Sequence, residues 1–145
     1  MRSNDENTLD ITPLTQAVKA YKNIVTYVNG VESKHDDELE FYQLEAVKSA
    51  LIQHFEFSYE LCWKFMKRYL AREGEDAELF SRKDIFRASI SMHLITDFDL
   101  WVKFHNARNS TLHTYNEEKA EEVFEVAKMF FREFTEFVKA LEARI

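Results

Sequence analysis

Glycine and proline are nearly absent from this sequence, whose 145 residues include only two glycines, Gly30 and Gly74, and one proline, Pro13. Folds built from short strands need a turn about every 8–12 residues, and those turns draw heavily on glycine and proline. Long helices joined by a few connections need far fewer turns. The sequence therefore predicts an all-α fold.

Apolar residues recur at spacings of three and four, which is the period of an amphipathic helix. The predicted helices are, in chain order, one from Thr12–Pro13 to Gly30, one from about Asp37 to Glu73, a short one over about 82–94, one that begins after Thr96–Asp97, and one that begins after Asn116. Short connections favour antiparallel neighbours. We therefore expect an up-and-down antiparallel four-helix bundle with an additional short helix, formed by a single domain over residues 10–145 and preceded by a disordered tail over residues 1–9.

Charge and composition narrow the classes of function. The formal net charge is −7, which argues against a protein that coats DNA or RNA nonspecifically. Cys62 is the only cysteine, so no disulfide can form within the chain. No apolar run approaches the roughly 20 residues needed to span a bilayer, and the first residues lack the apolar stretch of a secretory signal. We expect a cytoplasmic protein that does not enter membranes.

Several kinds of chemistry lack their sequence signatures. There is no glycine-rich phosphate loop, no His-Glu-x-x-His pair and no Cys-x-x-Cys pair, so we expect no metal and no cofactor. The acidic run His35–Glu38 precedes a predicted helix, where acids suit the helix dipole, and it is given no metal-binding role. Nucleotidyl transfer needs clustered carboxylates that hold magnesium. This chain is therefore not expected to be a nucleotidyltransferase by itself.

One segment, from Arg108 to Tyr115, is not explained by packing. Arg108 and His113 are five residues apart, and five residues turn a regular helix by roughly 140° net. The two side chains can converge only if the helix ends or loosens around Ser110–His113. Asn109, Ser110 and Thr111 permit this, because their side chains compete for backbone hydrogen bonds.

The residue types in this segment suit phosphate chemistry. Arginine offers a fixed, charged fork that matches phosphate oxygens, and histidine can move a proton near neutral pH. Tyr115 adds a hydroxyl and a stacking face, and Asn109 shares a helix face with His105. The alternative is structural: Arg108 pairs with a carboxylate, His113 caps a carbonyl, and Tyr115 packs on the last helix. Glu56, Glu60 and Lys64 are interpreted as a charge ladder along one helix.

The pattern Arg108-Asn109-x-x-x-His113-x-Tyr115 resembles the Arg-x4-His-x-Tyr motif of HEPN domains. The stretch from Phe55 to Lys64 and the block Ser81-Arg82-Lys83-Asp84 are similar to the bacterial nucleotidyltransferase substrate-binding branch of that family. Together with the helix lengths, the resemblance covers roughly residues 10–143.

This resemblance implies a helical bundle that forms homodimers and assembles with a separately encoded minimal nucleotidyltransferase, for which it binds the substrate. Some HEPN relatives are instead metal-independent endoribonucleases that act as toxins. Carried over, Arg108 would stabilise a phosphate of a nucleotide or RNA, and His113 would act as acid and base, with two subunits pooling their sites. In some toxin–antitoxin pairs the transferase adenylylates the motif tyrosine, which here is Tyr115. The residues leave open whether this site binds, cleaves or is modified.

Overall fold

A computed structural model describes residues 9–32 and 38–145 of the chain. The helices are, in chain order, α1 (Thr12–Glu32), α2 (Glu38–Arg72), the 3-10 turn η1 (Ala77–Leu79), α3 (Arg82–Ser91), α4 (Phe98–Ser110), the 3-10 turn η2 (Thr111–His113) and α5 (Glu117–Glu142). The described residues contain no strand, which confirms the all-α prediction.

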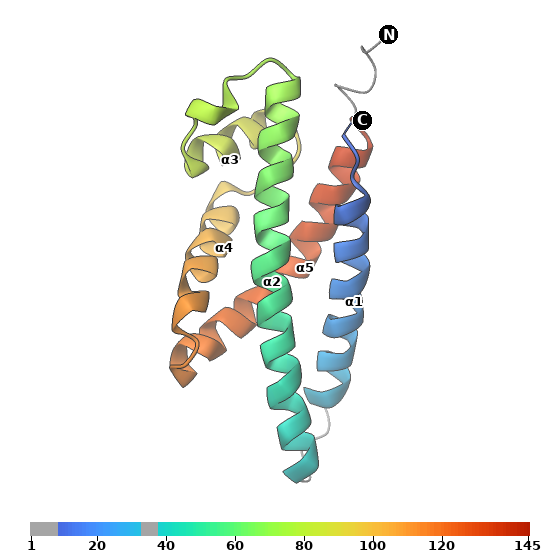
Figure 1. Cartoon of the computed structure of the whole chain (residues 1–145), viewed down its shortest axis with the longest axis vertical. Helices are drawn as coiled ribbons and strands as arrows, with labels where there is room; N and C mark the ends of the chain where they lie inside the picture. Colours follow the sequence, from blue (N-terminus) through green and yellow to red (C-terminus); the bar gives the residue numbers. More distant parts are fainter. Residues whose placement is uncertain (1–8, 33–37) are drawn as a thin grey trace.

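The long helices alternate in direction along the chain (Figure 1). Helix α1 descends, α2 ascends as the longest element, α4 descends and α5 ascends, while the short α3 lies beside one end of α2. Helix α5 passes behind α2 at a slant and reaches the side of α1. The up-and-down helical bundle with an additional short helix is thus confirmed.

The ends of α2 and α3 share one backbone arrangement. Gly74 has a φ of +94°, and the amide of Glu75 donates to the carbonyl of Leu70 while that of Gly74 donates to Ala71. This is a Schellman motif, in which glycine is the favoured left-handed residue. Helix α3 ends in the same way with His93 at φ 62°, and the amide of Leu94 donates to the carbonyl of Ser89. The predicted end of α3 near residue 94 was therefore about three residues too late.

Gly30 was expected to end the first helix, and this prediction was wrong, because α1 continues to Glu32. A glycine inside a helix costs about 1 kcal/mol relative to alanine, which neighbouring contacts can offset. The predicted start of α2 at Asp37 and the acidic run at 35–37 lie outside the described residues. So does the predicted tail over residues 1–9, except for Leu9, which is buried against the core.

Aromatic side chains fill the centre of the bundle. Phe130 is fully buried, and its ring centroid lies 5.1–5.8 Å from five other rings, which belong to Tyr21, Phe55, Trp101, Phe104 and Phe134. The Tyr21 hydroxyl donates to the carbonyl of Ala127, which satisfies its polar end inside the core. Cys62 is fully buried, and burial raises the pKa of its thiol. Helices α1, α2, α4 and α5 thus share one core.

No helix within the described ranges is both long enough and apolar enough to cross a membrane.

The start of α5 depends on one side chain. Asn116 accepts hydrogen bonds from the backbone amides of Glu118 at 2.9 Å and Lys119 at 3.2 Å, as predicted for an N-cap. We expect Asn116→Ala to lower the free energy of unfolding by about 1 kcal/mol in a urea titration. The exposed mid-helix variant Asn23→Ala should stay within about 0.5 kcal/mol of the wild type. Equal losses in both variants would contradict the capping role.

Candidate functional site

The helix that carries Arg108 ends where the sequence suggested. Helix α4 ends at Ser110, and the 3-10 turn η2 follows directly over Thr111–His113. The Ser110 hydroxyl donates to the carbonyl of Asn106 at 3.2 Å, and the Thr111 hydroxyl donates to that of Arg108 at 2.7 Å. These hydroxyls bond to backbone carbonyls at the point where regular α-helical bonding ends.

Two motif side chains lie exposed on the connection between α4 and α5. The rings of His113 and Tyr115 meet edge to face, with centroids 6.0 Å apart. The side chain of Tyr115 is 84% exposed, so it does not pack on α5 as the structural alternative supposed. Neither ring is held in the core. The bundle therefore presents His113 and Tyr115 to solvent on a short, ordered turn.

Arg108 points from α4 toward α2. Its Nη2 lies 3.5 Å from Glu56 Oε1, and its Nε lies 3.4 Å from Glu60 Oε1. In the part of the chain that the structure describes, no hydrogen bond or ion pair joins Arg108 to His113. The carboxylate pairing that the sequence left as an alternative is thus present, and the end of α4 does not join the two motif side chains by a hydrogen bond within one subunit.

The ion pairs of Arg108 are long. Charge-assisted hydrogen bonds between nitrogen and oxygen typically measure about 2.7–2.9 Å. Arg108 Nε is buried, and it has no hydrogen-bond partner despite the nearby Glu60 carboxylate. The side chain remains 23% exposed. The guanidinium is therefore positioned by α2 through long contacts, and the exposed part of the side chain can still meet another anion.

Glu60 also pairs with a second arginine. Arg82, at the start of α3, places Nη1 3.5 Å from the same Glu60 Oε1 and stacks over Trp63 with 4.0 Å between the guanidinium carbon and the ring centroid. The interpretation of Glu56, Glu60 and Lys64 as a ladder along one helix was therefore wrong, because both carboxylates pair with arginines of other helices. Only the stretch shared with the substrate-binding branch hinted at a role for these glutamates.

A polar chain links Arg82 to the motif helix. Arg82 Nη1 donates to the Tyr59 hydroxyl at 3.1 Å, and that hydroxyl lies 3.1 Å from Nδ1 of His105. Because arginine can only donate, the tyrosine proton is available for Nδ1. The Nε2 atom of His105 lies 3.5 Å from the Asn109 amide. Asn109 thus joins the site through His105, its neighbour on the same helix face.

Burial sets the protonation of this chain of groups. Burial lowers the pKa of His105, and the positive charge of Arg82 lowers it further. Burial also raises the pKa of Tyr59 to about 12, although the Arg82 hydrogen bond opposes the rise. Near neutral pH both groups are therefore uncharged, and His105 serves as a hydrogen-bond partner rather than as a cation.

We expect Arg82→Gln to raise the pKa of His105 toward its ordinary value, because the variant removes a nearby positive charge and leaves Glu60 without this partner. An NMR titration of the His105 ring measures this pKa directly. The control is Arg87→Gln, since Arg87 pairs with Asp84 on the exposed side of α3. An unchanged His105 midpoint in Arg82→Gln would contradict the electrostatic link.

A groove of about 440 Å³ runs beside Arg108 on the α2 side. Its walls include the exposed Phe57 ring and the exposed Lys64, together with Glu56 and Glu60. Over residues 9–32 and 38–145, no group of three or more His, Cys, Asp or Glu side chains is arranged to hold a metal ion. The groove combines two cations, Arg108 and Lys64, with two carboxylates and an exposed aromatic ring.

Comparison with known proteins gives the relationships of this chain. The family model described as "Nucleotidyltransferase substrate binding protein like" matches residues 9–143. The "Probable ribonuclease HepT" of Haemophilus influenzae is 38% identical over 96 residues, which span 64% of this chain and 66% of that protein. The match thus falls slightly short of two thirds of that relative's length.

A solved structure from Haemophilus influenzae is also similar, with a TM-score of 0.80 and 29% identity over 92% of this chain and 99% of that one. Its title says that it reveals the fold of a substrate binding domain of a nucleotidyltransferase. The family match and the shared fold agree with the resemblance drawn from Phe55–Lys64 and from the Arg108–Tyr115 motif. The chain belongs to the nucleotidyltransferase substrate binding protein-like family.

Proposed function

We propose that this chain is a cytoplasmic nucleotide- or substrate-binding subunit, which dimerises and assembles with a separately encoded minimal nucleotidyltransferase. The observation that carries the proposal is the state of Arg108. Two glutamates orient its guanidinium beside a groove, and its buried Nε has no hydrogen-bond partner. A phosphate that met the terminal nitrogens Nη1 and Nη2 with short bonds would compete with the long carboxylate contacts.

The exposed turn supports a role in association. His113 and Tyr115 are exposed on the connection between α4 and α5, and an exposed tyrosine is well suited to recognition by another protein. The same exposure would let a partner enzyme reach the Tyr115 hydroxyl. Under this proposal Tyr115 is both a contact and a modification point for the transferase, while Arg108, Asn109 and His113 bind the nucleotide or its phosphate.

Equilibrium binding of each ribonucleoside triphosphate tests the proposal. The transferase is measured alone and then with a saturating amount of this chain. We expect the chain to tighten the binding of at least one nucleotide, or of the acceptor, by about ten-fold, equivalent to about 1.4 kcal/mol. His113→Ala should reduce that gain, whereas the exposed α1 variant Lys22→Ala should not. Unchanged affinities for every nucleotide and acceptor would contradict a binding role.

A second candidate function is metal-independent RNA cleavage by a toxin that the transferase silences. The similarity to a protein named "Probable ribonuclease HepT" favours it, as does the intact Arg108–His113 spacing. Because no hydrogen bond joins Arg108 to His113 within one subunit, such a site would need a second subunit or a moved arginine. The two functions are compatible, because a regulated toxin must also bind its partner.

RNA cleavage in the presence of EDTA tests this candidate. Protein shown by mass spectrometry to be unmodified at Tyr115 should cut single-stranded RNA, and either Arg108→Ala or His113→Ala should abolish the cut. Arg87→Ala is the matched control for loss of a positive charge. Intact RNA after incubation with unmodified wild-type protein would exclude cleavage as the function.

A further inference from the structure

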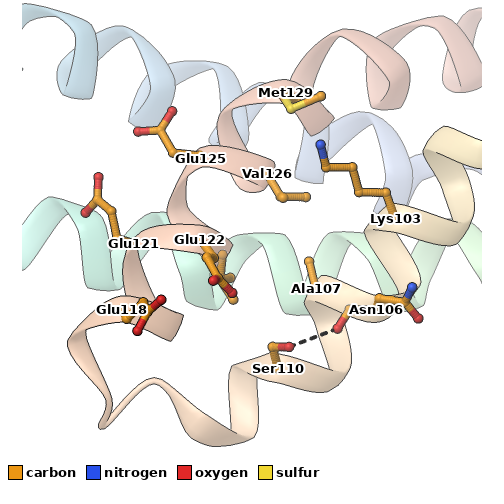
Figure 2. Close-up of a pocket in the computed structure, with 11 residues that line it drawn as sticks. Lys103, Asn106, Ala107, Ser110, Glu118, Glu121, Glu122, Glu125, Val126 and Met129 are labelled. Atoms are coloured by element: carbon orange, nitrogen blue, oxygen red, sulfur yellow. Dashed lines mark hydrogen bonds between the residues drawn. The ribbon is translucent and has the colours of Figure 1, made fainter.

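A larger groove lies on another side of α4, away from Arg108. It encloses about 810 Å³ between α4 and α5 (Figure 2). Ala107, Val123 and Val126 form its apolar floor, and Met129, which is 43% exposed, lies at one end. A partly exposed methionine over a floor of small apolar side chains is typical of surfaces that accept apolar partners.

The two walls of this groove differ in chemistry. On the α5 side Glu118, Glu122 and Glu125 follow one another at spacings of four and three, so they share one helix edge. Glu121 also lines the groove, and Lys103 on α4 is the one cation in the lining. The lining side chains therefore carry a formal charge of −3.

Lysines outside the groove contact three of its glutamates. Lys48 on α2 donates to Glu121 at 2.9 Å, which links α2 to α5. Lys119 lies 3.6 Å from Glu122, and Lys128 lies 3.2 Å from Glu125. Both are pairs of neighbours three residues apart on one helix, with glutamates more than half exposed. Exposed pairs of this kind contribute roughly 0–1 kcal/mol. Glu122 and Glu125 thus remain available to cations that approach from the groove, whereas Glu121 is held by Lys48.

The α4 wall allows close approach. Asn106, Ala107 and Ser110 are short side chains on one face of α4, and the Ser110 hydroxyl folds back onto the carbonyl of Asn106 (Figure 2). A groove between two antiparallel helices with one low wall fits the ridge of a third helix.

We propose that this groove docks an amphipathic helix of a partner protein, with apolar residues on the floor and lysine or arginine along the glutamate edge. Charge complementarity decides the occupant. A second copy of this chain would bring a lining of the same negative charge against it, whereas a basic helix would meet that charge with the opposite sign. The inference goes beyond the proposed function, because it concerns a different surface and does not require a nucleotide.

Three synthetic helical peptides of about 18 residues test the groove, enough to exceed the roughly 16 Å of α5 between Glu118 and Met129. They share one leucine and alanine stripe, and their polar positions are all lysine, all glutamine or all glutamate. Fluorescence anisotropy with the full chain should give binding of the lysine peptide at least about ten-fold tighter than that of the glutamate peptide. Equal binding of all three peptides, or of none, would overturn the proposal.

Matched variants localise the binding. Glu118→Gln, Glu122→Gln and Glu125→Gln together should remove most of the preference for the lysine peptide. Glu75→Gln, Glu136→Gln and Glu142→Gln change the net charge equally at exposed positions elsewhere and should keep it. Met129→Asp should weaken all three peptides, and circular dichroism verifies that it folds. If both triple variants lost the preference for the lysine peptide equally, the peptide would be responding to net charge alone, and the docking proposal would fail.

Sedimentation velocity without peptide tests whether a second copy of this chain occupies the groove. If the groove triple variant or Met129→Asp changes the mass of the free protein, the groove is a contact between copies of this chain and the proposal fails. An unchanged mass supports a foreign helix. No transferase is present in these experiments, so a negative result would not contradict association with the transferase. Likewise, a failure of that association would not contradict the docking groove.

Discussion

Phe130→Ala is expected to lower the free energy of unfolding by about 3–5 kcal/mol, the largest effect of any single change considered. The ring is fully buried and lies within 6 Å of rings from α1, α2 and α4 as well as from its own helix. Its removal leaves a cavity that four helices would have to close together. Chemical denaturation with urea, followed by circular dichroism, measures the loss.

Phe57→Ala is the matched control for the same truncation on the surface. Phe57 is 59% exposed on α2, so its removal should change the free energy of unfolding by no more than about 0.5 kcal/mol. A loss below about 1 kcal/mol for Phe130→Ala would mean that the aromatic cluster is not the centre of the core. If the wild-type protein has a free energy of unfolding of only about 5 kcal/mol, Phe130→Ala will be largely unfolded even without urea. That result would also agree with a central role for Phe130.

Under the proposed function, Arg108→Ala should weaken nucleotide binding by the complex of this chain with a transferase about 10- to 100-fold. The estimate rests on the roughly 1.5–3 kcal/mol contributed by a hydrogen bond to a charged group. The fold should survive, because Glu60 keeps its contact with Arg82 and Glu56 is 40% exposed. Isothermal titration calorimetry measures the affinity, and circular dichroism verifies the fold.

Two variants sharpen this result. Arg108→Lys keeps the charge but loses the planar fork, so it should recover only part of the affinity. Arg87→Ala removes a positive charge that is 62% exposed and pairs with Asp84, and it should bind nucleotide like the wild type. Full recovery by Arg108→Lys would show that only charge matters. Wild-type affinity in Arg108→Ala would remove Arg108 from the site.

Local chemistry explains why so much of the fold could be predicted. Asn116, Asp97 and Ser81 each accept a hydrogen bond from an amide two or three residues away, so the sequence around them is enough to place a helix start. Gly74 adopts the left-handed backbone that its residue type favours. The predicted end of the first helix at Gly30 was wrong because a glycine permits a helix to end but does not require it. The end of α3 was misplaced because the left-handed position is taken by His93 and not by a glycine, whose residue type would have marked it in the sequence.

In the candidate site, too, the local features could be predicted from the sequence, whereas the contacts between helices could not. The end of α4 near Ser110 followed from nearby polar side chains. The partners of Arg108 did not, because Glu56 and Glu60 lie about fifty residues earlier and reach it only when α2 and α4 pack together. The chain of contacts from Arg82 through Tyr59 to His105 joins three helices and has no local signature. The spacing of charges along α2 predicted ion pairs within that helix. Packing between helices instead brought Glu56 and Glu60 to arginines on α3 and α4.

The central claim is that this chain functions as the binding subunit of a nucleotidyltransferase, and direct association tests it most simply. The purified chain and a candidate minimal nucleotidyltransferase are mixed at micromolar concentrations and followed by sedimentation velocity. The account predicts one faster boundary that contains both proteins, and a weaker complex for Tyr115→Ala than for the exposed α1 variant Tyr27→Ala. Two separate boundaries at every concentration would contradict it.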